Sequence, residues 1–265
     1  MGTDKRERQK ANRQLKLEEM AREARKRKTK KRGLQIGLGV PLLIILVFVL
    51  VRLFGSDDSN KSISGATTTI VADGSTSTVP SGPLPCPAAD GSAAPVKTFS
   101  ASPPTCIDAG KKYTVTVTTS LGAYTAELYP DKAPLAVNSF VYLARYHYFD
   151  NTPCHRIIPG FVIQCGDPTG SGSGGPGYTF ADELPAAGEY KLGTLAMANS
   201  GPDTNGSQFF VISGDDGIAL PPSYSLFGQV TDGLDVVAKL DAVGTPGAGT
   251  PSTAVTINSV TVTEA

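Results

Sequence analysis

Apolar residues in the second half of the chain recur mostly at every second position or in short runs, as they do in β-strands. Residues 113–118 alternate apolar and threonine positions, residues 121–122 supply a turn, and residues 123–129 form a returning strand, which predicts a hairpin. Further short apolar runs lie at residues 157–158, 161–164, 195–198, 209–213, 226–230 and 255–262. We therefore expect eight short strands in this region.

Two segments of the same region have the apolar spacing of helices. The first begins at Pro134, a residue well suited to the first turn of a helix. Its apolar residues on one side are Val137, Phe140, Val141 and Ala144. The second follows Asp232, a candidate N-cap. Its apolar residues are Leu234, Val237 and Leu240. Many short strands with one early and one late helix predict a mainly β domain over residues 111–265, an antiparallel barrel with helical ends.

A transmembrane helix is predicted at residues 33–54. Residues 33–51 contain no charged side chain and are rich in Leu, Ile and Val. At about 1.5 Å per residue, such a helix matches an apolar bilayer core of about 30 Å. A cleaved secretory signal is the alternative, but the basic region before it is long, the apolar run exceeds the usual signal core and no clear small-x-small cleavage site follows. We therefore favour an uncleaved anchor.

Charge divides the chain into two opposite regions. Residues 1–32 hold 14 Lys or Arg against 5 Asp or Glu, whereas the residues after Arg52 hold 9 against 19. This excess of basic residues predicts a single-pass protein of the cell membrane, with residues 1–32 in the cytosol and the C-terminal domain extracytoplasmic. The basic segment is either a solvated charged region or a contact with anionic headgroups of the lipid bilayer. Nucleic acid is not an expected partner, because no aromatic residue interleaves with the basic ones.

Residues 55–110 are predicted to form a disordered linker. The segment consists largely of Ser, Thr, Ala, Gly and Pro and has few large apolar groups, so it buries too little surface to offset the entropy lost on ordering. Treated as a flexible coil, it has an end-to-end distance of about 40 Å. It would therefore hold the C-terminal domain off the membrane while keeping it close.

The four cysteines, Cys86, Cys106, Cys154 and Cys165, all lie on the side expected to be exported. That placement favours disulfides, and an even number of cysteines leaves three pairings open. We prefer the two local pairs, Cys86 with Cys106 and Cys154 with Cys165, of which the second could bridge neighbouring strands. A zinc site is the alternative, but the spacings are not those of a metal knuckle and the chain has only two histidines. No metal is therefore expected.

Residues 170–175, Gly-Ser-Gly-Ser-Gly-Gly, satisfy the G-x-G-x-x-G pattern of dinucleotide sites. The residues that follow, 176–180, open no helix, so the dipole that would hold a pyrophosphate is missing and a flexible loop is expected. The chain also lacks H-E-x-x-H, P-loop and G-x-S-x-G motifs. We therefore expect no cofactor and no hydrolytic triad.

Two blocks carry the strongest functional signal. Residues 155–167 have the sequence HRIIPGFVIQCGD, and residues 197–210 have the sequence MANSGPDTNGSQFF. They resemble the paired signatures of the cyclophilins, a family of peptidyl-prolyl cis/trans isomerases. The resemblance implies an eight-stranded antiparallel closed β-barrel capped by two α-helices, and X-Pro segments of unfolded or folded proteins as partners.

The resemblance also implies roles for individual residues. Arg156 stands where cyclophilins have their catalytic arginine, and Gln164 matches the residue that orients it. The residues expected to bind the substrate are Phe161, Val162, Ala198, Asn199, Gln208, Phe210, Leu220 and Tyr224. Proline isomerisation suits a chain poor in nucleophiles, because the reaction breaks no bond and only lowers a rotational barrier of about 18–20 kcal/mol.

The chain departs from the cyclophilin pattern between Ser213 and Leu226. Many cyclophilins have a tryptophan in this loop, whereas this chain has no Trp, carries Ile218 or Ala219 at that place in a loop one residue longer, and has Tyr224 where a histidine is common. Because the tryptophan lines the groove for cyclosporin, weak cyclosporin binding is expected. We expect an isomerase that assists the folding of extracytoplasmic proteins; a proline-binding chaperone or scaffold with little isomerase activity is the alternative.

Overall fold

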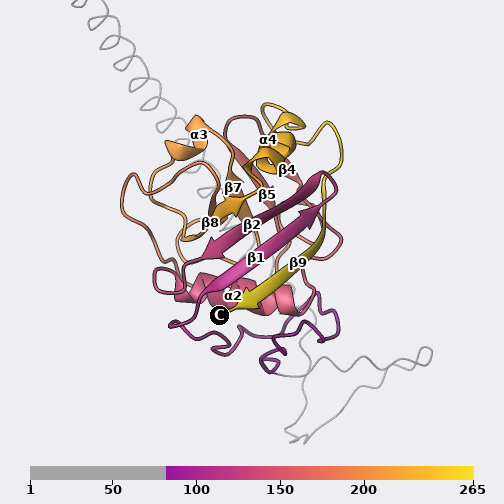
Figure 1. Cartoon of the computed structure of the whole chain (residues 1–265), viewed down its shortest axis with the longest axis vertical. Coiled ribbons are helices and arrows are strands. Elements are labelled where there is room, and N and C mark those ends of the chain that lie inside the picture. The colour runs from indigo at the N-terminus through magenta and orange to yellow at the C-terminus, as the bar shows by residue number, and fades with distance from the viewer. Residues whose placement is uncertain (1–81) are drawn as a thin grey trace, which may run out of the picture. The chain divides into compact units, whose positions relative to one another are not determined.

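The computed structural model of the chain describes residues 82–265 (Figure 1). The predicted basic segment 1–32, the predicted transmembrane helix 33–54 and the first part of the predicted linker lie outside the described residues. Within residues 82–265, no helix is both long and apolar enough to cross a bilayer.

The described part of the chain forms one curled antiparallel sheet with the strand order β3-β9-β1-β2-β8-β6-β7-β5-β4. The strands are β1 (Tyr113–Thr119), β2 (Gly122–Leu128), β3 (Thr152–Pro153), β4 (Arg156–Ile158), β5 (Val162–Cys165), β6 (Thr194–Met197), β7 (Phe209–Ile212), β8 (Leu226–Asp232) and β9 (Thr256–Glu264). The first two form the predicted hairpin, with Thr119 paired to Gly122.

The expectation of a closed, eight-stranded barrel is wrong in two respects. The described residues contain nine strands, because β3 also pairs with β9. The edge strands β3 and β4 do not pair with each other, so the sheet is a half-barrel rather than a closed one. Pro153 has no N–H to donate, and only Cys154 and His155 separate β3 from β4. The two edge strands are therefore joined by the two residues between them and not by hydrogen bonds between β3 and β4.

Three helices accompany the sheet in the described residues: α2 (Pro134–Arg145), α3 (Asp215–Ile218) and α4 (Leu234–Ala242). Helix α2 begins at Pro134 as predicted, and ten of its residues are buried. The ring of Phe140 on α2 contacts three core rings at centroid distances of 4.9–5.3 Å, namely those of Phe149, Phe209 and Phe227. The aromatic core therefore lies between this helix and the sheet.

The predicted start of the late helix is wrong by one residue. Asp232 is the last residue of β8, and Gly233 is the N-cap of α4, without any side-chain cap. Gly233 has a φ of 85°, and a Cβ at this position would lie 2.8 Å from the carbonyl oxygen of Ala123. Glycine is therefore required at the turn between strand and helix. The one-turn helix α3 was not predicted, because four residues are too few for a periodic pattern.

Residues 82–110, called the strap below, lie against the domain, whereas the sequence predicted a linker as far as residue 110. Phe99 of the strap is only 3% exposed. Its ring lies 5.2–6.3 Å from four tyrosine rings, those of Tyr142, Tyr146, Tyr148 and Tyr178. The Nζ of Lys97 donates to three carbonyl oxygens at 2.6–3.0 Å, those of His147, Tyr148 and Asp150. These few anchors hold a segment whose average composition is that of a linker.

Both preferred disulfide pairings are confirmed. Cys86 is bonded to Cys106 with a Cα–Cα distance of 5.3 Å, and Cys154 is bonded to Cys165 with a Cα–Cα distance of 4.0 Å. The first bond closes a loop within the strap. The second joins the residues just before β4 to β5, and both of its cysteines are only 2% exposed. The two bonds therefore differ in their access to solvent as well as in position.

Candidate active site

Side chains alternate along β5 and β7, so that one face of the sheet packs into the main core and the other face carries the candidate site. Ile163 and Cys165 on β5, and Phe209 and Val211 on β7, belong to the main core. Their neighbours along each strand must face the opposite side, because successive side chains of a strand point to opposite faces of the sheet. Phe210 belongs accordingly to a second, smaller cluster of buried residues on that side.

The strand register places four side chains in one row across this second face. Arg156 on β4 lies opposite Gln164 on β5, and Gln164 lies opposite Phe210 on β7. Phe210 in turn lies opposite Ala196 on β6. Directly opposed residues in antiparallel strands have their Cβ atoms about 5 Å apart. Residues from both sequence blocks are thus brought together by backbone pairing alone.

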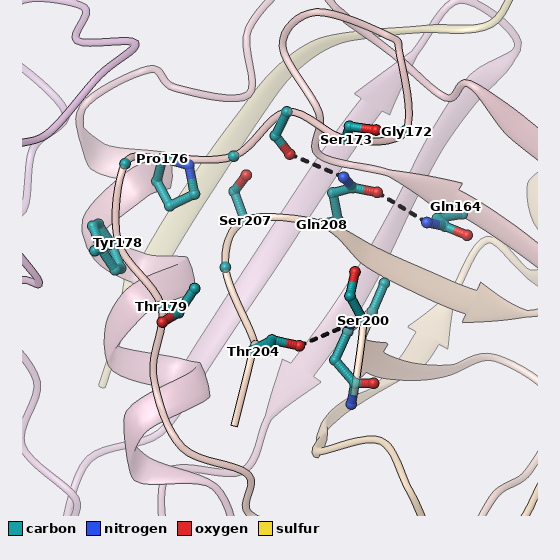
Figure 2. A pocket seen from close by; sticks show the side chains of 16 residues that line it. Gln164, Gly172, Ser173, Pro176, Tyr178, Thr179, Ser200, Thr204, Ser207 and Gln208 are labelled. Atoms are coloured by element: carbon teal, nitrogen blue, oxygen red, sulfur yellow. Dashed lines mark hydrogen bonds between the residues drawn. The ribbon is translucent and has the colours of Figure 1, made fainter. Parts of the chain in front are cut away.

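A pocket of about 240 Å³ opens on this face and is lined by nine residues. They are Arg156, Phe161, Val162, Gln164, Ala198, Asn199, Phe210, Leu220 and Tyr224. All nine belong to the ten site residues predicted from the sequence. The tenth, Gln208, lines an adjoining cavity of about 640 Å³, which it shares with Gln164, Ala198 and Asn199 (Figure 2). The structure gives the location of these residues, and their roles stay predictions.

The floor of the smaller pocket is apolar and its wall includes Tyr224. Phe210 is 4% exposed, and the ring of Tyr224 stands nearly perpendicular to it at a centroid distance of 5.3 Å. Tyr190 holds Tyr224 in place, because its hydroxyl donates to the carbonyl oxygen of Tyr224 at 2.7 Å and accepts from the amide of Tyr224 at 3.1 Å. Burial raises the pKa of Tyr190 to about 12, so the hydroxyl keeps its proton at neutral pH. Tyr190 lies between the two sequence blocks, where no motif or periodic pattern could identify it.

Arg156 is the cation of this pocket. Its Nη1 donates to Oε1 of Gln164 at 3.2 Å, and its guanidinium carbon lies 5.6 Å from the ring centroid of Phe161. Among residues 82–265, no carboxylate forms an ion pair with Arg156. Burial lowers the pKa of the neighbouring His155, so this ring adds no second positive charge at neutral pH. The other guanidinium N–H groups therefore remain available to a ligand.

Two amide side chains continue from Arg156 toward the glycine-rich loop of residues 169–174. Nε2 of Gln164 donates to Oε1 of Gln208 at 2.9 Å, and Nε2 of Gln208 donates to the carbonyl oxygen of Gly174 at 2.9 Å (Figure 2). The loop was expected to be flexible, but five hydrogen bonds join it to the carboxylate of Asp167. No helix follows it at residues 176–180, as the sequence predicted.

The chemistry open to the smaller pocket follows from its lining. None of its lining residues is Ser, Cys, His, Asp or Glu, so the pocket offers no carboxylate or imidazole base and no serine or cysteine nucleophile. It offers instead an apolar hollow, the cation Arg156 and two amide side chains, Gln164 and Asn199. Such a pocket can hold a small apolar ring while donating hydrogen bonds to a polar group beside it.

Known proteins with similar sequences support the same interpretation. The sequence model of the family described as "Cyclophilin type peptidyl-prolyl cis-trans isomerase/CLD" matches residues 114–262. A "Probable peptidyl-prolyl cis-trans isomerase B" of Mycobacterium tuberculosis (strain ATCC 25618 / H37Rv) is 44% identical over 165 residues, which are 55% of this chain and 53% of that protein. The protein of the same name in Mycobacterium leprae (strain TN) is 42% identical over 199 residues, 66% of this chain and 64% of that one. The chain thus spans about half to two thirds of the length of these curated relatives.

Solved structures resemble the fold as well. The crystal structure of a cyclophilin type peptidyl-prolyl cis-trans isomerase from Cryptosporidium parvum superposes with a TM-score of 0.53 at 33% identity, covering 57% of this chain and 98% of that one. A crystal structure of the same protein in the presence of the dipeptide Ala-Pro gives a TM-score of 0.52 at 34% identity. Since the family model covers more than half of the sequence, the chain belongs to the cyclophilin-type peptidyl-prolyl cis-trans isomerases.

Proposed function

We propose that this chain isomerises X-Pro peptide bonds in other proteins, with Arg156 as its catalytic residue. The observation that carries the proposal is a guanidinium that has no carboxylate partner among residues 82–265 and lies beside an apolar pocket whose floor includes Phe210. The crystal structure of the neighbour from Cryptosporidium parvum in the presence of the dipeptide Ala-Pro supports a proline-containing ligand for this chain.

In the proposed mechanism the proline ring occupies the pocket and the amide lies beside Arg156. Rotation about a peptide bond costs about 18–20 kcal/mol, because the C–N bond has partial double-bond character. Halfway through the rotation the prolyl nitrogen regains a lone pair, and Arg156 donates a hydrogen bond to it. The bond from Arg156 to Gln164 keeps the guanidinium oriented toward this position. The transition state is thus bound more tightly than either ground state.

The size of the required effect is modest. Turnover at about 10–1,000 per second corresponds to a barrier of about 13–16 kcal/mol, so roughly 5 kcal/mol must be removed. One charge-assisted hydrogen bond contributes about 1.5–3 kcal/mol. Donors held in place within a water-poor pocket account for the remainder, because they need no reorganisation during the reaction. A single arginine in a preorganised setting is therefore sufficient.

The test compares the full-length chain with its Arg156→Ala and Arg156→Lys variants in an isomerisation assay on an X-Pro peptide. Loss of one charge-assisted bond predicts that kcat/KM of Arg156→Ala falls by about 10- to 150-fold. Arg156→Lys should retain part of the activity, because lysine supplies the charge without the planar fork of donors. Lys191→Ala removes an exposed cation that lines neither cavity and serves as the matched control. Equal rates for the parent chain and Arg156→Ala would refute the proposal.

A second function, a proline-binding chaperone or scaffold, is favoured by one observation. The loop between residues 213 and 226 has no tryptophan and carries a 37%-exposed Ile218 at the end of α3. This function predicts tight binding of X-Pro peptides with turnover near the uncatalysed rate. It also predicts that the Arg156→Ala variant still prevents aggregation of an unfolded protein. Measured catalysis in the parent chain that depends on Arg156 excludes it as the main function.

We further propose that the domain is tethered to the cell membrane and assists the folding of extracytoplasmic proteins. The uncharged segment 33–51, the basic segment before it and two disulfides, which persist in oxidising compartments, support this location. Protease added to intact spheroplasts of an expressing host should remove the C-terminal domain while an epitope placed before residue 33 survives. Complete protection of the domain in intact spheroplasts would contradict the proposal.

A further inference from the structure

Gln164 and Gln208 connect Arg156 to the carbonyl oxygen of Gly174 by a series of hydrogen bonds. The groups at the two ends of this series determine which way each side-chain amide is turned. Arg156 can only donate, and the carbonyl oxygen of Gly174 can only accept. Gln208 must therefore turn its NH₂ group to Gly174 and its oxygen to Gln164. Gln164 must then turn its own oxygen to Arg156. The loop carbonyl thus determines which atom of Gln164 the arginine meets.

From this geometry we infer that Asp167 and Gly174 are positioning residues for Arg156, acting through Gln208 and Gln164. The inference rests on the proposed isomerase function and extends it to residues that line no part of the smaller pocket. Gly174 lines the larger cavity, and its carbonyl oxygen accepts from Nε2 of Gln208. Asp167 is fully buried beneath the loop.

The carboxylate of Asp167 holds the loop at the amide of Gly174, the residue whose carbonyl oxygen accepts from Gln208. It accepts from the amides of Thr169, Gly172 and Gly174 at 2.7–3.0 Å. It also accepts from the hydroxyls of Thr169 and Ser171 at 2.7 and 3.2 Å. Burial alone would raise the pKa of Asp167, but these hydrogen bonds outweigh burial and lower the pKa to about 2. The carboxylate is therefore ionised at neutral pH and binds both ends of the loop.

A comparison of Gly174 with Gly175 distinguishes the contact with Asp167 from a general requirement for glycine in the loop. A Cβ on Gly174 would lie 2.0 Å from Oδ1 of Asp167 and 2.8 Å from Oγ1 of Thr169, so the loop and the carboxylate would have to separate. A Cβ on Gly175 would meet nothing within 4 Å. Neither glycine has a positive φ, so alanine is sterically allowed by the backbone at both positions. The same substitution at neighbouring positions therefore tests the packing of Gly174 against Asp167 and Thr169.

The experiment measures kcat and KM for an X-Pro peptide with the full-length parent chain and with Gly174→Ala, Gly175→Ala and Arg156→Ala. We expect kcat of Gly174→Ala to fall about tenfold, which corresponds to about 1.4 kcal/mol of transition-state stabilisation. Its KM should stay within about twofold, because the pocket for the proline ring is untouched. Gly175→Ala should match the parent chain within about twofold, as substitutions away from contacts usually do.

Side-chain amide signals in NMR spectra provide a readout that a purely structural role would not move. In Gly174→Ala the NH₂ signals of Gln208 and Gln164 should shift toward values typical of solvent-exposed amides, while backbone signals of the main core stay in place. If Gly174→Ala fails to fold, Thr169→Val replaces it, since it removes the hydroxyl that donates to Asp167 and also bonds to Ser171. A smaller fall in kcat, about threefold, is then expected, because the amides of Thr169, Gly172 and Gly174 still hold the carboxylate.

The outcomes distinguish the inference from the function on which it rests. An inactive parent chain, or one as active as Arg156→Ala, refutes the proposed function itself. An active parent chain in which Arg156→Ala is impaired while folded Gly174→Ala keeps the kcat of Gly175→Ala refutes only the inference. A fall in kcat of Gly174→Ala without any change in the amide signals of Gln208 and Gln164 also refutes it, because the proposed route to Arg156 would be intact.

Discussion

Mild reduction should open the Cys86–Cys106 bond while leaving the Cys154–Cys165 bond closed. Cys86 and Cys106 belong to the strap at the surface, and Cys106 is partly exposed, whereas Cys154 and Cys165 are almost fully buried within the domain. Thiol–disulfide exchange requires direct attack of a thiolate on a sulfur atom, so access controls the rate. The folded chain should therefore pass through a form in which only the strap bond is open.

The cost of opening each bond follows from the loop that it closes. The cysteines are separated by 20 residues in the strap and by 11 residues at the site. Loop-closure entropy then predicts that each bond contributes about 3 kcal/mol to the free energy of unfolding. Opening the strap bond should leave isomerase activity unchanged, because no strap residue lines the smaller pocket. Opening the Cys154–Cys165 bond should lower kcat in addition to stability, because Cys165 adjoins Gln164 and Cys154 lies two residues before Arg156.

The assay titrates the folded chain with reductant, blocks free thiols by alkylation and counts the added groups by mass. Urea unfolding of each species is followed by far-UV circular dichroism, because the chain has no tryptophan to report by fluorescence. A Cys86→Ala/Cys106→Ala variant is the control, and it should match the species with two alkylated thiols. Alkylation of Cys154 and Cys165 before the strap cysteines, or an unfolding free energy unchanged by either bond, would refute the reasoning.

Two further predictions concern pH and a ligand. Nε2 of His147 lies 2.8 Å from the carbonyl oxygen of Gly91 and Nδ1 lies 2.9 Å from Oδ2 of Asp150, and these hydrogen bonds raise the pKa of His147. Their contribution to stability is complete below the unfolded pKa of about 6.5 and is lost as the pH rises through the higher folded pKa. The urea midpoint of the parent chain should therefore fall as the pH rises above about 6.5, and it should fall less in His147→Gln. An equal pH dependence in both proteins would contradict this. Cyclosporin should inhibit weakly, since the chain has no Trp and Tyr224 occupies the wall of the pocket; a low nanomolar inhibition constant would count against the prediction.

The parts of the fold that the sequence predicted are those with a regular local pattern. The hairpin of residues 113–128 and the helix that begins at Pro134 follow from alternation and helical spacing, and the structure contains both. The nine pocket residues were assigned from the resemblance to the cyclophilins, and the register of β4, β5 and β7 explains why three of them, Arg156, Gln164 and Phe210, meet. Periodicity alone could not have supplied that register, because it depends on pairing between distant segments.

The parts that the sequence did not predict depend on single residues that act over long sequence distances. Phe99 and Lys97 are among the residues that hold the strap, and their partners, Tyr142 and His147 among them, lie far along the chain. The average composition of the segment, which is that of a linker, does not show such contacts. Three of the five hydrogen bonds between the glycine-rich loop and Asp167 come from backbone amides, which any loop sequence supplies. Tyr190 supports Tyr224 through backbone atoms in the same way.

The position of β9 beside β1 has a consequence for how the protein is made. β1 pairs along its length with β9, and Tyr113 pairs with Glu264, about 150 residues later in the sequence. The pairing of β1 is therefore completed only after β9 has been synthesised. Contacts of such long sequence separation slow folding, because chain entropy must be lost before they form. During synthesis β1 therefore has only its hairpin partner β2, and one of its edges stays open to unwanted pairing with other chains. A protein proposed to help others fold would thus itself complete its folding late and depend on protection in the meantime.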